Sequence, residues 1–470
     1  MDSQYYLDTF GVTRQQLERL TSTALRHGGD YSDLYFEYTT YFNLLLKDGV
    51  VSSGGFHTDF GVGIRVLKGE KTGYAYSENT EMPDMLKAAE AASAIALGTA
   101  GSMNYVKISD PGNDFYPGSS SWRSRSAEDF LPFLTSLEKS IFAKDTRIIK
   151  VMARLSDSVS DVMMFNSLGE LTYDTRPMGS VTVTVIFQQN GRTENKSVSR
   201  SFRCGSEMIG QTLIDEMAED AVAGIDARFE ATRPKGGQMN VVMGAGASGI
   251  LLHEAMGHAF EADFNRKGQS VFSEKMGRKV CPEGVSVVDD GTLKWNRGSG
   301  NHDDEGVPGQ KTYMVKDGIL NSYLHDRISA AWYGVTPTGN GRRENFRYNP
   351  IPRMRATYME NGEADPDSII ASVRHGIYVD EFSNGQVKIG EGDFTFYVRS
   401  GFMIEDGHLA APVKDINIIG NGPQALSDIL AVGNDLKIDN GTWTCGKEQS
   451  VPVSCGMPTV LISNLTVGGE

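Results

Sequence analysis

Residues 241–265, VVMGAGASGILLHEAMGHAFEADFN, form the stretch around which the rest of the chain is predicted to be arranged. An apolar run is followed by a turn of small residues and then by a helical run. The helical run carries two of the eight histidines, His253 and His258, and Glu254 directly follows the first. A His-Glu pair with a second histidine close behind is typical of zinc sites carried on one helix. The segment therefore predicts a strand, a turn and a helix that bears a metal site.

The spacing of the two histidines sets a condition on that helix. At 3.6 residues per turn, side chains four residues apart lie about 40° apart around a helix, whereas five residues put them about 140° apart. Two imidazoles on nearly opposite faces cannot both reach one metal ion at about 2.1 Å. A π-bulge adds one residue to a turn, and Gly257 supplies backbone freedom for it. We therefore expect a π-type or broken turn between His253 and His258, and a straight α-helix would remove the metal interpretation.

A second motif overlaps the first. Residues 244–249, GAGASG, match the pattern G-x-G-x-x-G, which follows a strand and opens a helix in dinucleotide-binding folds. Those folds also place an acidic residue at a strand end about 20 residues further on. Glu261 and Asp263 lie at that distance, but within the helical run. A nicotinamide-dependent oxidoreductase is therefore the alternative interpretation, and a non-catalytic binding subunit is a third.

Composition and charge narrow the class of protein. The 470 residues carry a net charge of −15, which argues against direct nucleic-acid binding. No run of 18 apolar residues occurs, and the N-terminal MDSQYYLDTF lacks the basic and apolar regions of a signal peptide. We therefore expect a cytoplasmic protein with no membrane association, and its length suggests two domains.

The polar segment 231–237, ATRPKGG, is the best domain boundary. Residues 1–230 are predicted to mix strands and helices, with a helix over 206–226. Residues 231–470 are rich in short strands. The predicted fold class is α+β, with an N-terminal domain of mixed strands and helices and a C-terminal β-rich, barrel-like domain around one metal-binding helix. In the first half, Asp48-Gly49 and Asn190-Gly191 predict tight hairpin turns, and Ser206 is the candidate N-cap of the last helix.

A catalytic zinc site needs three protein ligands and one open position. One ligand must therefore come from outside the His-Glu-His segment. The candidates are the thiols and acids Cys281, Cys445, Cys455, Glu261 and Asp263. The chain has four cysteines, too few for a disulfide framework at this length, so each is free to ligate a metal or to lie buried as a thiol. Neither spacing nor composition selects one of these candidates.

Several segments of the second half resemble those of one known family. They occur in the family's order and spacing, and they are HEAMGHAFEADFNRKGQSVFS at 253–273, DDEGVPGQ at 303–310, TPTGNGRRENF at 336–346, VGNDLKIDNG at 432–441 and TCGKE at 444–448. Together they are similar to the TldD branch of the TldD/PmbA family. The first half of the chain matches more loosely, in its pattern of elements.

This resemblance implies a metal-dependent peptidase with one zinc ion held by His253, His258 and Cys445. Glu254 is then the catalytic acid or base, which takes a proton from a zinc-activated water and passes it to the leaving amine. A dimer is also implied, of two copies of this chain or with a PmbA-type subunit, with contacts from the N-terminal domain. The PmbA branch lacks HExxxH, so this chain resembles the catalytic partner. The older family label, modulator of DNA gyrase, implies a physiological link rather than a nuclease.

Three further residues are predicted to contact the substrate. Arg342 and Arg343 lie in a glycine-rich segment and would hold a carboxylate or an oxyanion. His302 precedes the acids at 303–305 and would lie near the substrate. An ordinary solvated loop is the alternative for each of them. The expected substrates are unfolded or short peptides, which would pair with a strand edge through the main chain.

Overall fold

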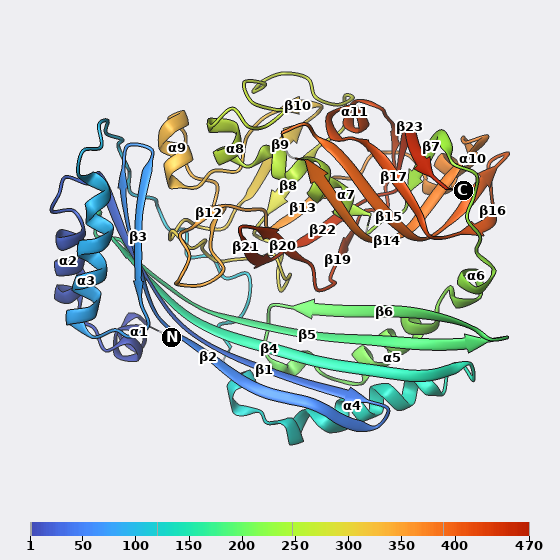
Figure 1. Ribbon diagram of the computed structural model, residues 1–470, viewed down its shortest axis with the longest axis horizontal. Helices are drawn as coiled ribbons and strands as arrows, with labels where there is room; N and C mark the ends of the chain where they lie inside the picture. The colour runs from blue at the N-terminus through green and yellow to red at the C-terminus, as the bar shows by residue number, and fades with distance from the viewer. Residues whose placement is uncertain (1, 120, 247, 389, 470) are drawn as a thin grey trace.

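The computed structural model describes residues 2–119, 121–246, 248–388 and 390–469, and it confirms the α+β class (Figure 1). A long curved sheet with helices makes up the first half of the chain. A closed barrel and a second sheet make up the other half, which lies above the curved sheet in Figure 1. In the described part of the chain, no helix is both long enough and apolar enough to cross a membrane.

The N-terminal half is built on an antiparallel sheet in the order β3-β2-β1-β4-β5-β6. Two of its hairpins turn at Asp48-Gly49 and Asn190-Gly191, where both residues of each pair have positive φ angles, so both predicted turns are confirmed. The strands are β1 (Tyr31–Lys47), β2 (Val50–Lys68), β3 (Lys71–Ser77), β4 (Ile148–Asn166), β5 (Leu171–Gln189) and β6 (Arg192–Phe202).

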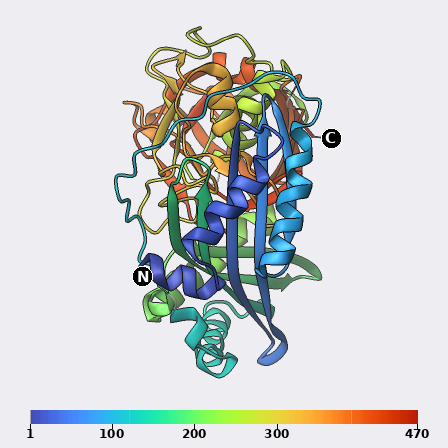
Figure 2. The same cartoon turned by 90° about the vertical axis from the view of Figure 1, so that its left-hand side faces the viewer.

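Helices cover one face of this sheet in two groups. Side chains alternate between the faces of a strand, so Leu34, Phe36, Phe42 and Leu44 of β1 all point to the same face. The first two pack against α1–α3, which Figure 2 shows in front of the sheet, and the other two pack against α4 and α5. The helices are α1 (Ser3–Phe10), α2 (Arg14–Ala24), α3 (Met82–Ser93), α4 (Ala127–Phe142), α5 (Gln211–Val222) and α6 (Ile225–Glu230).

The helix expected over 206–226 is wrong at both ends. At its end, α5 stops at Val222, and Gly224, with a φ of 71°, separates it from α6. A 3-10 turn spans Ser206–Met208, and α5 begins only at Gln211. Gly210 between them is fully extended, with φ −165° and ψ −176°, so the chain cannot run through as one helix. Ser206 therefore does not cap α5.

The opposite face of the sheet is turned toward the C-terminal half. Tyr35 and Glu37 of β1 point this way and are buried. The main-chain N–H of Phe346, from the C-terminal half, donates to Glu37 Oε2 at 2.8 Å. The polar face of the curved sheet is therefore an internal surface between the two halves.

A closed barrel forms part of the C-terminal half. Its strands pair in the ring β14-β7-β23-β17-β15, and β15 closes the ring by pairing with β14. Their bounds are β7 (Gly237–Met243), β14 (His375–Lys388), β15 (Asp393–Glu405), β17 (Ile416–Asn421) and β23 (Val460–Gly468). Two further strands join this sheet, β16 (His408–Val413) and β18 (Ile429–Val432).

A second sheet, in the order β10-β9-β8-β13-β22-β19, lies beside the barrel. Its strands are β8 (Val287–Asp290), β9 (Lys311–Lys316), β10 (Ile319–Leu320), β13 (Ala356–Met359), β19 (Lys437–Asp439) and β22 (Ser454–Met457). Two short hairpins are made by β11 (Gly341–Arg342) with β12 (Ile351–Pro352) and by β20 (Thr444–Lys447) with β21 (Gln449–Pro452). The two histidines lie in a helical segment that runs from α7 (Gly249–Leu252) to α8 (Ala262–Arg266). Beyond this segment the C-terminal half has the helices α9 (Arg327–Tyr333), α10 (Pro366–Ala371) and α11 (Gly422–Ser427).

The helical segment that carries the two histidines lies in the core between the barrel and the second sheet. One buried cluster joins Met243 of the barrel, Leu251 and Met256 of the helical segment, and Val287 and Met314 of the second sheet. The expectation of a β-rich, barrel-like C-terminal region around one central helix is therefore confirmed.

Candidate metal centre

The helical segment changes its winding at the first histidine. One α-helical turn, α7 (Gly249–Leu252), is followed by a π-helical turn over His253–Gly257 and a 3-10 turn over His258–Phe260. In a π turn the hydrogen bond spans five residues instead of four, so side chains five apart come to the same side. The ring centroids of His253 and His258 lie 5.2 Å apart. The π-type turn predicted from the five-residue spacing is confirmed.

Gly257 serves a different purpose from the one expected. Its φ and ψ, −57° and −47°, are ordinary right-handed helical values that any residue adopts. A Cβ atom at this position would instead overlap the sulfur of Met354, which is fully buried. The glycine is therefore required for close packing, not for backbone freedom.

Two glycines of the GAGASG segment also serve packing, and Gly246 has a φ of 100°, a left-handed value that favours glycine. Gly244 lies against the side chain of Tyr378, and Gly249 lies against the backbone of Gly456 in β22. The preceding strand, β7, pairs in parallel with β14 and antiparallel with β23 in the barrel. The next strand after the helical segment, β8, lies in the second sheet, so the segment is not the strand-helix-strand unit of a dinucleotide-binding fold. The G-x-G-x-x-G pattern thus lets the helical segment approach β22 closely.

A thiol from far along the chain completes a cluster with the two histidines. Cys445 lies on β20, and its Sγ is 3.3 Å from His258 Nε2. One ligand atom each from His253, His258 and Cys445 lie within 4.8 Å of one another, and all three side chains are buried. Figure 1 shows the hairpin β20–β21 in the same part of the molecule as α7.

The electrostatics distinguish Cys445 from the other candidate thiols. Burial raises the pKa of Cys281 to about 12 and holds the pKa of Cys455 well above its usual value. Burial opposes ionisation of Cys445 too, but the imidazoles of His253 and His258 outweigh it and lower the pKa of this thiol to about 4. Since the thiolate is the form that binds a metal, Cys445 suits the role of ligand.

Glu261, a candidate third ligand in the sequence, lies behind His258 instead. Its Oε2 is 2.9 Å from His258 Nδ1 and 3.1 Å from Lys447 Nζ. Burial would raise the pKa of Glu261, but Lys447 and His258 lower it to about 2, and the carboxylate in turn keeps the pKa of His258 well above its usual value against the effect of burial. When a carboxylate binds the ring nitrogen that faces away from the metal, it orients the histidine and strengthens it as a ligand. Asp263, another candidate ligand, accepts a hydrogen bond from Lys447 at 2.8 Å. It therefore reaches His258 only through Lys447 and Glu261.

The donor set fits a zinc ion. Two imidazoles and a thiolate are ligands that zinc prefers. Neither ring nitrogen of His253, which is 1% exposed, has a hydrogen-bond partner among the described residues. A buried imidazole without a partner is costly unless another group, such as a cation, satisfies it. The Oε2 of Glu254 lies 3.9 Å from His258 Nε2, so this carboxylate is beside the cluster and remains partly exposed.

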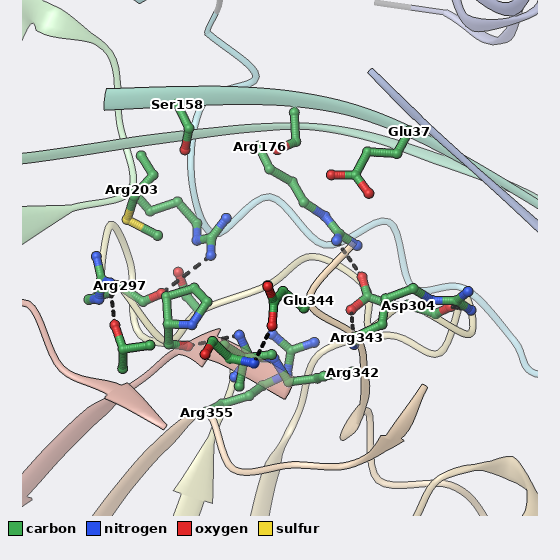
Figure 3. A pocket seen from close by; sticks show the side chains of 18 of the residues that line it. Glu37, Ser158, Arg176, Arg203, Arg297, Asp304, Arg342, Arg343, Glu344 and Arg355 are labelled. Carbon is green, nitrogen blue, oxygen red and sulfur yellow. Dashed lines mark hydrogen bonds and ion pairs between the residues drawn. The ribbon is translucent and has the colours of Figure 1, made fainter. Parts of the chain in front are cut away.

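The predicted substrate contacts lie apart from this cluster. His302, Arg342 and Arg343 line a cavity of about 320 Å³ between the curved sheet and the C-terminal half (Figure 3). The guanidinium of Arg342 donates to the carbonyls of Met354 and Pro452. The structure therefore brings these three residues together at one cavity, but it does not bring them to the cluster of His253, His258 and Cys445.

Two residues near the cluster were missed from the sequence. Lys447 stands two residues after Cys445 and so projects from the same face of β20, which is a signal that could have been used. Arg353 is fully buried and donates to the carbonyls of Cys445 and Gln449 at 2.6 and 2.7 Å. It holds the β20–β21 hairpin in place, and no sequence spacing pointed to it.

Comparisons with known proteins show which family the chain is similar to. Models of the PmbA/TldA metallopeptidase family match the chain at residues 32–96 (domain 1), 120–227 (central domain) and 236–469 (C-terminal domain). The chain is 38% identical to a metalloprotease TldD homolog of Haemophilus influenzae, over 94% of this chain and 93% of that protein. It is 31% identical to a zinc metalloprotease TldD homolog of Saccharolobus solfataricus, over 52% of this chain and 54% of the other. The crystal structure of TldE from Thermococcus kodakarensis has the same fold, with a TM-score of 0.76 at 19% identity, over 97% of this chain and all of that one.

Proposed function

The chain belongs to the PmbA/TldD metallopeptidase family, and we propose that this metallopeptidase holds one zinc ion between His253, His258 and Cys445. We propose further that Glu254 is its acid and base and that unfolded or short peptides are its substrates. The observation that carries the proposal is the convergence of the three ligand atoms, within 4.8 Å, beside the Glu254 carboxylate.

The residues around the cluster support this assignment of roles. Glu261 accepts from Nδ1 of His258, which leaves Nε2 facing Cys445 Sγ and directed toward a shared cation. Arg353 and Lys447 fix the strand that carries the thiolate. A zinc ion held there supplies an electrophile for the peptide carbonyl and an acidified water, whose pKa falls toward about 7.

Glu254 is placed to move protons. It belongs to the same π turn as His253, and it stays partly exposed while the three ligands are buried. Its carboxylate can accept a proton from the attacking water and pass it to the nitrogen of the leaving amine. The Glu254 side chain does not need to bind the metal for this role.

A cavity of about 480 Å³ offers a place for the peptide. It is lined by residues 196–200 of β6, by Phe382 and Arg399 of the barrel, and by Trp443, two residues before Cys445. β6 is the last strand of its sheet in the described part of the chain. Its outer edge is bonded at Asn195 and at Ser201, and the edge between them can receive an extended peptide. Main-chain pairing would accept many sequences, so a strict dependence of cleavage on one side chain would contradict this part of the proposal.

We also propose, from the family resemblance, that the enzyme works as a dimer, of two copies or with a PmbA-type subunit. In this division of labour residues 1–230 serve as scaffold and dimer contact, and residues 231–470 carry the chemistry. Light scattering of the chain alone and mixed with a PmbA-type protein measures the assembly. A chain that stays monomeric and fully active would contradict it.

The central test separates metal binding from catalysis. In Glu254→Gln the three ligands remain, so we expect about one zinc per chain by elemental analysis but slower cleavage of denatured casein. Loss of a positioned acid and base costs about 10²- to 10⁴-fold in rate. In Cys445→Ser we expect zinc itself to be lost.

Cys204→Ser is the matched control for the thiol variant. Cys204 is also buried, but its pKa is raised to about 12 by burial and it lies outside the cluster. It should keep its zinc and its activity. Full cleavage by Glu254→Gln, or full zinc in Cys445→Ser, would overturn the proposed roles. A wild-type protein with neither zinc nor turnover would indicate a non-catalytic subunit.

A further inference from the structure

The cavity of about 320 Å³ between the two halves is unusual in its charge. Arginines contribute much of its wall: Arg176, Arg203, Arg297, Arg342, Arg343 and Arg355. Arg176 and Arg203 enter it from the side of the curved sheet, and Arg342 and Arg355 enter from the opposite side (Figure 3). The chain as a whole carries a charge of −15, so this concentration of cations is local to the cavity.

In the part of the chain that the structure describes, most of these guanidinium groups have no counter-ion. Among the described residues, no carboxylate oxygen lies within ion-pair distance of Arg203, Arg297, Arg342 or Arg355. Their hydrogen-bond partners are backbone carbonyls and hydroxyl groups, and Arg203 also lies over the ring of Tyr116 at 5.1 Å. Arg355, for example, donates to the carbonyls of Gly339 and His302. Arg203, Arg342 and Arg355 are only 7%, 5% and 4% exposed, so water does little to screen their charges.

The acids that line the cavity do not balance these charges. Asp304 is engaged by Arg176, and Glu344 lies at the exposed rim, where it accepts from the N–H of Ser450 at 2.6 Å. Burial raises the pKa of Glu37 and of Asp157 to about 7, so both carry a proton for part of the time near neutral pH.

The arginines themselves reflect the imbalance. Burial and the nearby Arg355 hold the pKa of Arg342 well below its usual value. Burial and the nearby Arg203 lower the pKa of Arg297 to about 10. A buried charge without a partner is costly, and a bound anion would remove that cost.

We propose that this cavity is an oxyanion-binding site, which takes a carboxylate or phosphate group between Arg203, Arg297 and Arg342. A guanidinium presents paired N–H donors that match the two oxygens of such a group. The anion has two sources, the carboxylate end of a peptide or free phosphate. This inference does not depend on the proposed zinc chemistry.

The site adjoins the metal cluster through one hairpin. Arg297 donates to the Trp443 carbonyl at 3.0 Å, and Arg342 donates to the Pro452 carbonyl at 2.8 Å. Both contacts lie at the open end of β20–β21, the hairpin that carries Cys445, where Thr444 pairs with Pro452. Thr444 lines the cavity, and the next side chain, Cys445, points to the other face of the strand. The anion site and the metal cluster therefore share this hairpin.

Isothermal titration calorimetry tests the proposal on the full chain as purified. The probes are sodium phosphate, N-acetylalanylalanine and the C-terminal amide of that dipeptide. We expect wild-type protein to bind at least one of the first two with a Kd of about 1 mM or tighter, and to bind the amide far more weakly. Arg203→Gln and Arg297→Gln should each weaken binding about tenfold or more, as expected for lost hydrogen bonds to a charged group.

Two controls keep the outcome decisive. Arg147→Gln removes the same charge from a partly exposed arginine that is paired with Asp145 and Asp226, away from the cavity, and should bind as wild type. Cys445→Ser should retain anion binding, because the arginines remain. Binding that disappears in Cys445→Ser would place the anion on the metal and overturn the proposal.

The choice of probes identifies the source of the anion. Phosphate binding alone identifies free phosphate as the source, and preference for the dipeptide over its amide identifies a peptide carboxylate. Either result supports the site. The proposal would be overturned if wild type bound neither anion. It would also be overturned if both arginine variants bound with wild-type affinity and had unchanged circular dichroism spectra. If one variant misfolds, Arg297→Lys keeps the charge but not the paired donors, and weaker binding by it supports the site.

Discussion

At the scale of single residues, the metal centre depends on side chains that do not touch the metal position. His258 is oriented by Glu261, and Glu261 is held by Lys447. The two oxygens of the Glu261 carboxylate lie in a fully buried place, so its charge is felt strongly by its neighbours. A ligand's basicity and direction are thus set by a residue three positions further along the helical segment.

Replacing Glu261 by Gln should therefore weaken zinc binding without removing a ligand. Loss of such a partner typically costs about 10- to 100-fold in metal affinity. Competition for zinc with a chromophoric chelator measures the change. Asp263→Asn is the control, since Asp263 contacts Lys447 but not His258, and its affinity should change less. Equal zinc affinity in Glu261→Gln and wild type would contradict the role given to Glu261.

A second buried acid predicts a dependence of stability on pH. Burial raises the pKa of Asp157 from its usual 3.8 to about 7 in the folded chain. Between these two values the folded chain keeps a proton that the unfolded chain releases, so the free energy of unfolding falls as the pH rises from about 4 to about 7.

Asp157→Asn has no such proton to lose. We expect it to be more stable than wild type at pH 8, by about 1 to 3 kcal/mol, and the difference to vanish toward pH 4. Denaturant unfolding across this pH range measures it. Asp406→Asn, at an exposed aspartate, should show no pH-dependent difference. If the difference in free energy of unfolding between wild type and Asp157→Asn were the same at every pH, the effect would be disproved.

At the scale of secondary structure, one inserted residue decides whether a metal centre forms. The π turn over His253–Gly257 places two histidines five positions apart on one side. Close packing stabilises this turn, because Met354 packs on Gly257 and the β22 backbone packs on Gly249. The turn and its neighbours act as one packed unit.

Gly257→Ala tests that packing. The added methyl would overlap the Met354 sulfur, so we expect a loss of about 1 to 3 kcal/mol in the free energy of unfolding and weaker zinc binding. Met354→Ala is itself destabilising because it empties a buried position, but it also removes the clash. The double variant should therefore lose less than the sum of the two single losses. Gly210→Ala, where a Cβ would meet no atom within 4 Å and φ is extended, should be nearly neutral. Strict additivity would contradict the proposed contact.

At the scale of the whole molecule, buried ion pairs join the two halves. Arg65 of β2 lies 2.6 Å from Glu305 of the C-terminal half and also pairs with Asp33. Glu305 accepts from the N–H of Arg327 at 2.7 Å, and Arg327 reaches back to Glu170 of the first half. Arg65 and Glu305 are almost completely buried. The halves should therefore unfold together.

Breaking this network should separate them. Glu305→Gln leaves Arg65 with less of its counter-charge, and breaking a buried pair costs about 3 to 5 kcal/mol. In differential scanning calorimetry we expect one transition for wild type, and a lower and divided transition for the variant. Lys87→Gln, which breaks the exposed pair with Asp84, should change stability by less than about 1 kcal/mol. A single unshifted transition in Glu305→Gln would show that the network does not couple the halves.

Features that depend on nearby residues could be predicted from the sequence. The turns at Asp48-Gly49 and Asn190-Gly191 follow from residues that tolerate positive φ. The π turn follows from helix geometry and the five-residue spacing of two histidines. The local predictions that failed involve glycines: Gly210 interrupts the helix expected from Ser206, and Gly257 makes room for Met354 instead of freeing the backbone. In each failure a short segment did not reveal the conformation or the neighbour that decided the outcome.

The sequence alone thus determined the α+β class, the π turn and the list of candidate ligands, because strand alternation, helix period and turn chemistry are short-range. The family resemblance implied Cys445 as a ligand, whereas spacing and composition did not. Only the tertiary structure showed its Sγ beside His258, 187 residues away in the chain, put Glu261 behind that histidine, and gathered Arg203, Arg297 and Arg342 around one cavity. These outcomes depend on how the barrel, the second sheet and the curved sheet pack against one another. That packing is a property of the whole core, so no local spacing encodes it.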